Sequence, residues 1–340
     1  MLPLLWCLSL VFRVAVGGRL LCYRLGLLKR IRLPGKTWSV GNIAVGGTGK
    51  SPVTISLAEM LLSSGARPAI LTRGYGAPIA RGDCLILRSG QLIRPASSTN
   101  VIPDEARMQS AVLQNIPVIA GPDRVSAAKV FLNEFPDYRP THWLLDDGFQ
   151  HLKIERDLDI VLLDAKNPLP SLMPLATARE PARSLRRANL VVFTRSSQSY
   201  PSDVDLTKVR SLVRTGTPTL KTEMRTASPT MSVDGSMQFD PLKHTPAGLV
   251  SGIAEPKQLI DAVKAMGITV GQTLSLRDHQ PISRESLVRL AATQKSVLTT
   301  AKDYWRDPTI FERVSVPVFI LDLEVFWGQS NLKHILNDYI

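Results

Sequence analysis

The chain has 340 residues, 44% of them hydrophobic and 21% charged, a balance that excludes a disordered polypeptide and predicts a globular protein of two domains. Its three cysteines stand far apart and outside any motif, which excludes a disulfide framework and a zinc site: Cys7, Cys22 and Cys84. The net charge of +12 favours a polyanionic partner, either nucleic acid, an anionic membrane or a phosphorylated substrate. With 6% aromatic residues and no RNA-binding signature, nucleic acid is the least favoured of these.

Residues 1–35 predict an amphipathic helix. Four arginines fall within roughly 140° on a helical wheel: Arg13, Arg19, Arg24 and Arg30. The remaining face is apolar and carries Leu4, Val11, Leu21, Cys22, Leu25 and Leu28. No run reaches the roughly 18 uncharged residues of a spanning helix, and no secretory cleavage site stands out. The pattern favours a helix at the surface of an anionic bilayer that ends near Pro34-Gly35, with docking on its own domain and a true span as alternatives.

From Lys36 onward, apolar strand-like runs alternate with helical stretches, the rhythm of a parallel sheet covered by helices. In the first block, strands are predicted at 37–40, 69–72, 117–120, 142–145, 159–163 and 189–194, and helices at 53–64, 105–115 and 124–135. The second block carries predicted elements at 248–253, 257–266, 285–292, 296–300 and 316–321. We expect an α/β fold with two lobes (36–215 and 247–340), a linker with short strands at 216–246, and a substrate cleft between the lobes.

The strongest local pattern is a glycine-rich loop between a predicted strand and a predicted helix. It comprises Gly46, Gly47, Thr48, Gly49, Lys50 and Ser51. Such a loop turns backbone N–H groups toward phosphate oxygens at the positive end of the helix. Lys50 would then reach the β- and γ-phosphates, and the Ser51 hydroxyl would bind Mg²⁺. The loop predicts nucleotide binding, although Ala44 stands where the usual spacing has glycine and a purely structural turn stays the alternative.

A second pattern is an apolar strand that ends in two carboxylates, Asp146 and Asp147. In a phosphate-loop fold, an acid at this place holds Mg²⁺ or its water shell. Two adjacent acids on a loop are also common in a solvated turn. Because these acids follow a buried strand in the same lobe as Lys50, we predict that they bind the metal, and which of the two faces it stays open.

A set of ordered motifs resembles the tetraacyldisaccharide 4′-kinase family of Gram-negative bacteria. The motifs run in order from about residue 37 to 303: Val40-Gly41-Asn42, Gly46–Pro52, Arg73-Gly74-Tyr75-Gly76, Asp104-Glu105, Gly121-Pro122-Asp123-Arg124, Asp146-Asp147-Gly148-Phe149-Gln150-His151, Arg156-Asp157, Arg179-Glu180-Pro181, Ser251-Gly252-Ile253, Asp278-His279, Thr299-Thr300 and Lys302-Asp303. The run from Asp146 to His151 is highly specific. The departures are Ser51, Gln280, Ala301 and the Val-Ile-Pro before Asp104, and none of them removes a catalytic group.

The resemblance implies a P-loop kinase that uses ATP and Mg²⁺ to phosphorylate the 4′-hydroxyl of a tetraacylated disaccharide 1-phosphate, giving lipid IVA in lipid A biosynthesis. It also implies work at the cytoplasmic face of the bacterial inner membrane, where an interfacial helix would bring the enzyme to an acylated substrate. The expected partners are therefore the lipid A precursor and an anionic membrane surface. Nucleic acid is not expected, and we expect a monomer.

The same resemblance assigns roles to individual residues. Asp104 is the expected base for the sugar hydroxyl, and His279, from the second lobe, orients or tunes it. Read without the resemblance, Asp104 is a helix cap and His279 a surface residue. Contacts with the acceptor or the metal shell are expected from Gln150 and His151. Contacts with the substrate 1-phosphate or the nucleotide are expected, with buried ion pairs as the equal alternative, from Arg73, Arg124 and Arg179.

Two other classes of protein share part of this pattern. Another P-loop small-molecule kinase or an ATP-dependent ligase would have the phosphate loop but gives no account of the basic N-terminal helix. A nucleotide-gated, nucleic-acid-associated module would account for the charge and would bind DNA or RNA with a steep salt dependence. Neither accounts for the ordered motifs across both lobes.

Overall fold

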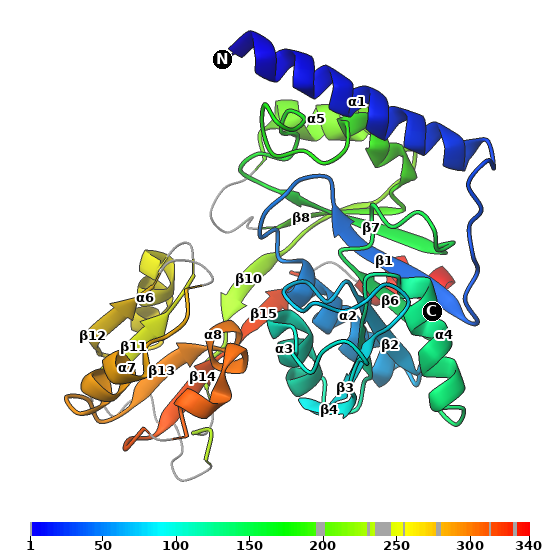
Figure 1. Ribbon diagram of the computed structural model, residues 1–340. Coiled ribbons are helices and arrows are strands. Elements are labelled where there is room, and N and C mark those ends of the chain that lie inside the picture. The colour runs from blue at the N-terminus through cyan, green and yellow to red at the C-terminus, as the bar shows by residue number, and fades with distance from the viewer. Residues whose placement is uncertain are drawn as a thin grey trace. The chain divides into compact units, whose positions relative to one another are not determined.

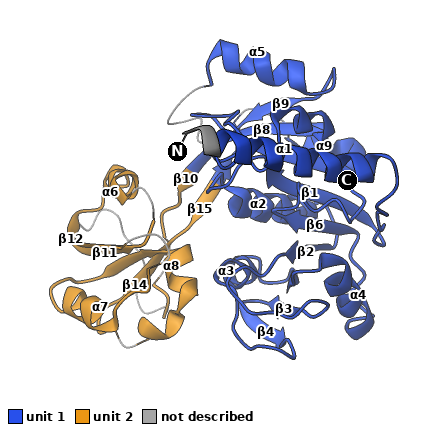
Figure 2. Ribbon diagram, turned by 45° about the horizontal axis from the view of Figure 1, so that its top comes forward, with its two compact units in different colours: residues 1–224, 325–340 blue, residues 225–324 orange. Residues whose placement is uncertain are grey.

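A computed structural model describes residues 2–194, 201–229, 232–234, 246–253, 256–276, 280–312, 314–328 and 332–340 (Figure 1). The chain forms two compact units, which Figure 2 colours separately. Unit 1 comprises Met1–Met224 and Val325–Ile340, and unit 2 comprises Arg225–Glu324. The chain crosses between the units within two strands that pair with each other, β10 (Glu223–Thr226) and β15 (Leu323–Phe326).

Unit 1 is built on a nine-stranded sheet with the order β4-β3-β5-β2-β6-β1-β7-β8-β9. Its strands are β1 (Lys36–Asn42), β2 (Pro68–Thr72), β3 (Leu85–Arg88), β4 (Gln91–Arg94), β5 (Val118–Ala120), β6 (His142–Asp146), β7 (Leu158–Asp164), β8 (Leu190–Thr194) and β9 (Thr219–Lys221). Neighbouring strands run parallel, except that β3 is antiparallel to both β5 and β4. Val40 pairs with Asp146, so β1 and β6 end side by side at the same edge of the sheet.

Helices cover both faces of this sheet, which explains why its central strands are apolar at successive positions. Leu144 of β6 lies in one core cluster with Leu57, and the next residue, Leu145, lies in another with Phe131. The helices of unit 1 are α1 (Leu2–Arg24), α2 (Lys50–Ser63), α3 (Asp104–Val112), α4 (Arg124–Glu134), η1 (Ala182–Arg187), α5 (Asp203–Leu212), α9 (Leu332–Leu336) and η3 (Asn337–Tyr339). The predicted α/β architecture with a parallel sheet is confirmed.

The N-terminal helix α1 ends at Arg24, well before the predicted end near Pro34-Gly35. Gly26 takes a left-handed conformation with φ of 75°, which stops the helix. The following residues pair with another segment instead of continuing the helix. The Ile31 N–H donates to the Lys153 carbonyl at 2.8 Å, and the Glu155 N–H donates to the Ile31 carbonyl at 2.9 Å.

One side of α1 contacts other segments of unit 1, and the other side is apolar and exposed. The Arg19 guanidinium donates to the Gln150 carbonyl at 3.0 Å, and the Ser9 hydroxyl donates to the Leu172 carbonyl at 3.5 Å. The outer side includes large apolar residues that are more than half exposed: Trp6, Leu10, Val11, Val14 and Leu21. By length and composition alone, Leu5–Arg24 is apolar enough to cross a membrane. The helix therefore combines features of the three alternatives from its sequence, namely a helix at the membrane surface, a helix docked on its own domain and a membrane span.

Unit 2 contains a smaller parallel sheet with the order β12-β11-β13-β14. Its strands are β11 (Ala247–Ser251), β12 (Val270–Ser275), β13 (Val297–Thr300) and β14 (Val318–Leu321). Its helices are α6 (Pro256–Ala265), α7 (Arg284–Ala291), α8 (Ala301–Arg306) and η2 (Pro308–Ile310). Val250 and Leu249 lie in two different core clusters, so this sheet is also covered on both faces.

The unit boundaries differ from the lobes expected from the sequence. The expected second lobe, 247–340, included the C-terminal segment, but Val325–Ile340 belongs to unit 1. The reason is apolar packing, because Leu332 and Leu336 are buried in the core cluster that also holds Leu57 and Val53. The expected linker, 216–246, contains β9, which is the edge strand of the large sheet.

Candidate active site

The glycine-rich loop joins β1 to α2 as predicted from its sequence. Gly46 and Gly49 have φ values of 123° and 77°, which residues with a side chain rarely adopt. The Lys50 ammonium donates to the Gly46 carbonyl at 3.3 Å. The Lys50 side chain therefore lies against the loop. From there its ammonium could bind a phosphate together with the backbone amides of the loop.

Hydrogen bonds to neighbouring segments hold this loop in place. The Asn42 amide donates to the Thr48 hydroxyl at 2.8 Å, and the Val45 N–H donates to the Thr177 carbonyl at 2.7 Å. Ala44 pairs with Ala178 in an antiparallel bridge, and its φ is not positive. The position at which the usual motif has glycine is therefore ordinary backbone here, and alanine fits it.

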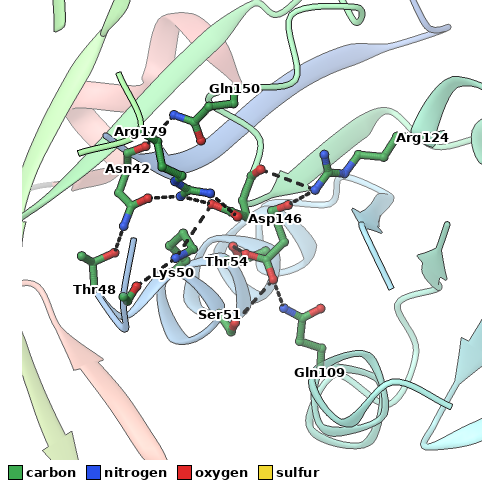
Figure 3. Close-up of polar contacts among 12 residues, drawn as sticks. Asn42, Thr48, Lys50, Ser51, Thr54, Gln109, Arg124, Asp146, Gln150 and Arg179 are labelled. Carbon is green, nitrogen blue, oxygen red and sulfur yellow. Dashed lines mark hydrogen bonds and ion pairs between the residues drawn. The ribbon is translucent and has the colours of Figure 1, made fainter. Parts of the chain in front are cut away.

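Asp146 is buried at the end of β6, with 3% of its surface exposed. Its side chain accepts hydrogen bonds from the Gln109 amide at 2.5 Å and from the Ser51 and Thr54 hydroxyls, each at 3.4 Å (Figure 3). Burial raises the pKa of Asp146, and the charge of Asp147 raises it further, while the hydrogen bond from Gln109 lowers it. The carboxylate is thus held beside the start of α2, where the phosphate loop ends.

Asp147 lies in a different environment, although it is the next residue. It has a φ of 49°, and it accepts two hydrogen bonds from the Arg179 guanidinium, at 2.7 and 2.8 Å. The Lys50 ammonium lies 3.8 Å from Asp147 Oδ1, which is also the oxygen that accepts from Arg179 at 2.7 Å. Burial by itself raises the pKa of Asp147, but the hydrogen bonds from Arg179 and the charges of Lys50 and Arg179 together hold it below its usual value. Arg179 also donates to the Asn42 side chain, so these residues form one network around the loop (Figure 3).

Arg124 contacts the backbone of the two acids, and His151 follows Asp147 by four residues along the chain. The buried Arg124 guanidinium donates to the carbonyl oxygens of Asp146 and Asp147 at 2.8 and 3.4 Å, and burial lowers its pKa to about 10. Burial also lowers the pKa of His151 to about 3, and the charge of Arg124 adds to this effect. Among the described residues, His151 Nε2 has no hydrogen-bond partner. Arg124 is therefore a buried cation held by backbone carbonyls, and its predicted contact with the substrate 1-phosphate or the nucleotide stays a prediction.

The other predicted site residues are less closely gathered. Gln150 donates its amide to the Asn42 carbonyl at 2.9 Å, which places it beside the loop. Arg73 is exposed, and no hydrogen bond or ion pair of its side chain occurs within the described ranges. Asp104 is the first residue of α3, following Pro103 at the cap position. His279 lies outside the residues that the structure describes, so its predicted partnership with Asp104 stays a prediction.

Similarity to known proteins extends over the whole chain. A family profile described as "Tetraacyldisaccharide-1-P 4'-kinase" matches residues 1–340. The tetraacyldisaccharide 4′-kinase of Anaeromyxobacter dehalogenans (strain 2CP-C) is 34% identical over 340 residues, covering 96% of this chain and 87% of the relative. That of Chlorobium limicola (strain DSM 245) is 32% identical over 352 residues, covering 99% and 98%. The chain belongs to the tetraacyldisaccharide 4′-kinase family.

A solved structure shows the same fold. The crystal structure of LpxK from Aquifex aeolicus in complex with ATP matches with a TM-score of 0.79 at 29% identity, covering 99% of each chain. The predicted family and the predicted fold are therefore confirmed, and so is the prediction that the chain is a kinase. The predicted role of each site residue stays untested by these similarities.

The donor set of this kinase fits Mg²⁺, which takes oxygen ligands and commonly uses one or two carboxylates together with substrate phosphates and water. Asp146 and the hydroxyl of Ser51 meet at 3.4 Å, and Asp147 follows directly. No cluster of three or more His, Cys, Asp or Glu side chains suited to a metal occurs within the described part of the chain. The site thus fits a metal that is shared with a nucleotide better than one held by the protein alone.

Three residues of this kinase's site were not assigned roles from the sequence: Asn42, Thr54 and Gln109. Asn42 was part of a quoted motif, and Thr54 follows Ser51 by three residues, so both signals were present in the sequence. Gln109 carried no such signal, because its neighbour Asp146 is 37 positions away along the chain. Only the packing of α3 beside α2 and β5, which brings Gln109 to Asp146, reveals it.

Proposed function

We propose that this kinase transfers the γ-phosphate of ATP to the 4′-hydroxyl of tetraacyldisaccharide 1-phosphate and thereby forms lipid IVA. The observation that carries the proposal is the arrangement of Lys50 and the Asp146–Asp147 pair around a phosphate loop, in a chain that matches the family profile from end to end. Relatives carry the name of this activity, and the related Aquifex aeolicus structure contains ATP.

The residues at the loop divide the work of phosphoryl transfer. The amides of Gly46–Gly49 and the Lys50 ammonium would bind the phosphates, and Ser51 with Asp146 or Asp147 would hold Mg²⁺. When bound, Mg²⁺ neutralises charge on the β- and γ-phosphates. Arg179 holds Asp147 in place through two hydrogen bonds, so the geometry of the acid does not depend on the nucleotide alone.

The hydroxyl of the acceptor must lose a proton, and we propose that Asp104 is the base that accepts it. Asp104 begins α3, which packs beside the phosphate-loop helix α2, so the carboxylate belongs to the same unit as Lys50. His279, from unit 2, would orient or tune Asp104. This pairing follows the family resemblance of the two motifs, and variants of Asp104 test it.

The exposed apolar side of α1 supports a location at the membrane surface. Val11 and Val14 are each 66% exposed, and Arg13 and Arg24 lie beside this apolar side on the helix. A substrate with four acyl chains stays in a bilayer, so a kinase attached to the cytoplasmic face of the inner membrane can reach its sugar headgroup. We propose that the enzyme works there as a monomer.

Transfer of labelled phosphate to the lipid tests the proposed reaction. Purified protein in mild detergent is incubated with labelled ATP, Mg²⁺ and tetraacyldisaccharide 1-phosphate. We expect label in the lipid, a loss of at least about 100-fold for Lys50→Ala because phosphate charge is no longer neutralised, and a similar loss for Asp104→Ala because the base is removed.

Two exposed residues provide matched controls, Lys129→Ala and Asp137→Ala, and both should retain activity. If folded, ATP-binding protein transfers no label to the lipid, the lipid-kinase proposal is wrong. If Asp104→Ala keeps full activity while Lys50→Ala does not, the reaction stands and only the assignment of the base fails.

A further inference from the structure

A fully buried glutamine lies in the middle of α3. Gln109 has 0% of its surface exposed, and its amide nitrogen donates to Asp146 Oδ2 at 2.5 Å (Figure 3). Its oxygen, Oε1, has no hydrogen-bond partner among the described residues. A buried amide destabilises the folded state unless it is hydrogen-bonded, and a carboxylate can only accept. The contact with Asp146 is therefore what this side chain is placed to make.

The bond from Gln109 is the shortest that the Asp146 side chain makes in the described part of the chain. The hydroxyls of Ser51 and Thr54 lie at 3.4 Å, at which distance a hydrogen bond is weak. Ser51 and Gln109 share the same oxygen, Oδ2. The orientation of the carboxylate beside Ser51 is consequently set mainly by Gln109.

The position of Gln109 is itself fixed by apolar packing. Ala106, one turn before it on α3, is buried in the same core cluster as Val53 and Leu57 of α2. This packing holds the backbone of α3 against α2, and it therefore fixes the point from which the Gln109 side chain extends. Because α3 also begins at Asp104, one rigid element carries both the assigned base and the donor to Asp146.

We propose that Gln109 is a positioning residue of the phosphate site, which acts by holding Asp146 in the orientation that binds the nucleotide with its Mg²⁺. The proposal rests on the nucleotide-binding role of Asp146 in the proposed function. In this role Gln109 acts on the site through its hydrogen bond to Asp146. A glutamine that merely filled the core would affect folding, whereas a positioning residue must affect binding through Asp146 alone.

A double-mutant cycle separates these two roles. The affinity for a non-hydrolysable ATP analogue with Mg²⁺ is measured by titration calorimetry for Gln109→Met in the native background and in an Asp146→Ala background. Methionine is close to glutamine in shape but lacks the N–H donor. We expect a weakening of about tenfold or more in the native background, as for other groups that orient metal ligands, and less than twofold in the Asp146→Ala background.

Two further variants keep the cycle interpretable. Gln109→Asn retains an amide that is one methylene too short to reach, and it should behave as Gln109→Met does, which covers the case that Gln109→Met fails to fold. Gln114→Met changes an exposed glutamine just after α3 and should leave affinity unchanged in both backgrounds. Thermal unfolding confirms that each variant is folded.

Equal weakening by the Gln109 variants in both backgrounds would overturn the proposal, and so would unchanged affinity in the native background. Because the cycle measures nucleotide binding, its outcome does not depend on the lipid acceptor. Phosphate transfer to the lipid by the unmodified protein, measured in parallel, shows separately whether the proposed reaction fails.

Discussion

The two adjacent aspartates show how environment divides roles between identical side chains. Burial raises the pKa of Asp146, whereas Arg179 and Lys50 hold that of Asp147 below its usual value. The group formed by Lys50, Arg179 and Asp147 carries a net positive charge, since two cations face one ionised carboxylate. This excess attracts an anionic phosphate, and the fixed ion pair keeps Asp147 in position beside the loop.

The depressed pKa of His151, about 3, predicts a specific acid sensitivity. Histidine in the unfolded chain has a pKa of about 6.5, so below that pH the unfolded state takes up a proton that the folded state takes up only near pH 3. The contribution of neutral His151 to the free energy of unfolding is fully present above about pH 6.5 and is lost as the pH falls toward 3. Between about pH 6 and pH 4, stability should fall more steeply than in His151→Gln, by up to about 1.4 kcal/mol per pH unit.

Urea unfolding at intervals between pH 7 and pH 4 measures this difference. Parallel profiles for His151→Gln and the unmodified protein would show that His151 is not held neutral by its surroundings.

At the scale of elements, local patterns predicted the sheet well where strands are buried on both faces. The predicted strand at 142–145 is β6, and the predicted helix at 124–135 is α4, because apolar runs and helix signals agree there. The hairpin of β3 and β4 was not predicted, although Ser89 and Gly90 both have positive φ, as a tight two-residue turn requires. Gln109 could not be predicted at all, because its contact with Asp146 depends on packing between distant segments.

A close approach between β1 and the loop after β6 explains one glycine of the site. A Cβ added at Gly41 would lie 2.6 Å from the Cβ of Phe149 and 2.7 Å from its backbone nitrogen. Phe149 is fully buried, so it cannot move aside easily. Gly41→Ala should therefore lower the free energy of unfolding by about 1–3 kcal/mol and weaken nucleotide binding, since the displaced loop carries Asp147.

Gly18→Ala is the matched control, because a Cβ at this position of α1 meets nothing within 4 Å. In a helix, this change should leave stability unchanged or raise it by up to about 1 kcal/mol. Chemical denaturation of both variants checks the pair. Equal effects of the two substitutions would mean that the contact between β1 and Phe149 does not constrain position 41.

At the scale of the whole molecule, the division into units depends on contacts that the order of the sequence conceals. The sequence indicated two α/β lobes, but the last residues return to unit 1, where Leu332 and Leu336 join its core. The Trp327 indole donates to the Ser56 hydroxyl of α2 at 2.9 Å, which fixes the returning segment to the phosphate-loop helix. A chain that leaves a unit and returns to it cannot be divided at a single linker, and composition alone does not show the return.

The outer side of α1 predicts how the whole molecule associates with membranes. The protein should float with vesicles that contain anionic phospholipid, and the double variant Val14→Asp/Leu21→Asp should bind at least about tenfold more weakly, because two apolar side chains no longer enter the bilayer. Val204→Asp, on the exposed side of α5, is the control and should bind normally. Release by high salt or alkaline carbonate would indicate a helix at the surface, whereas resistance to both would indicate a span. Absence of flotation, or an equal loss for Val204→Asp, would contradict the assignment of α1 as the membrane-binding element.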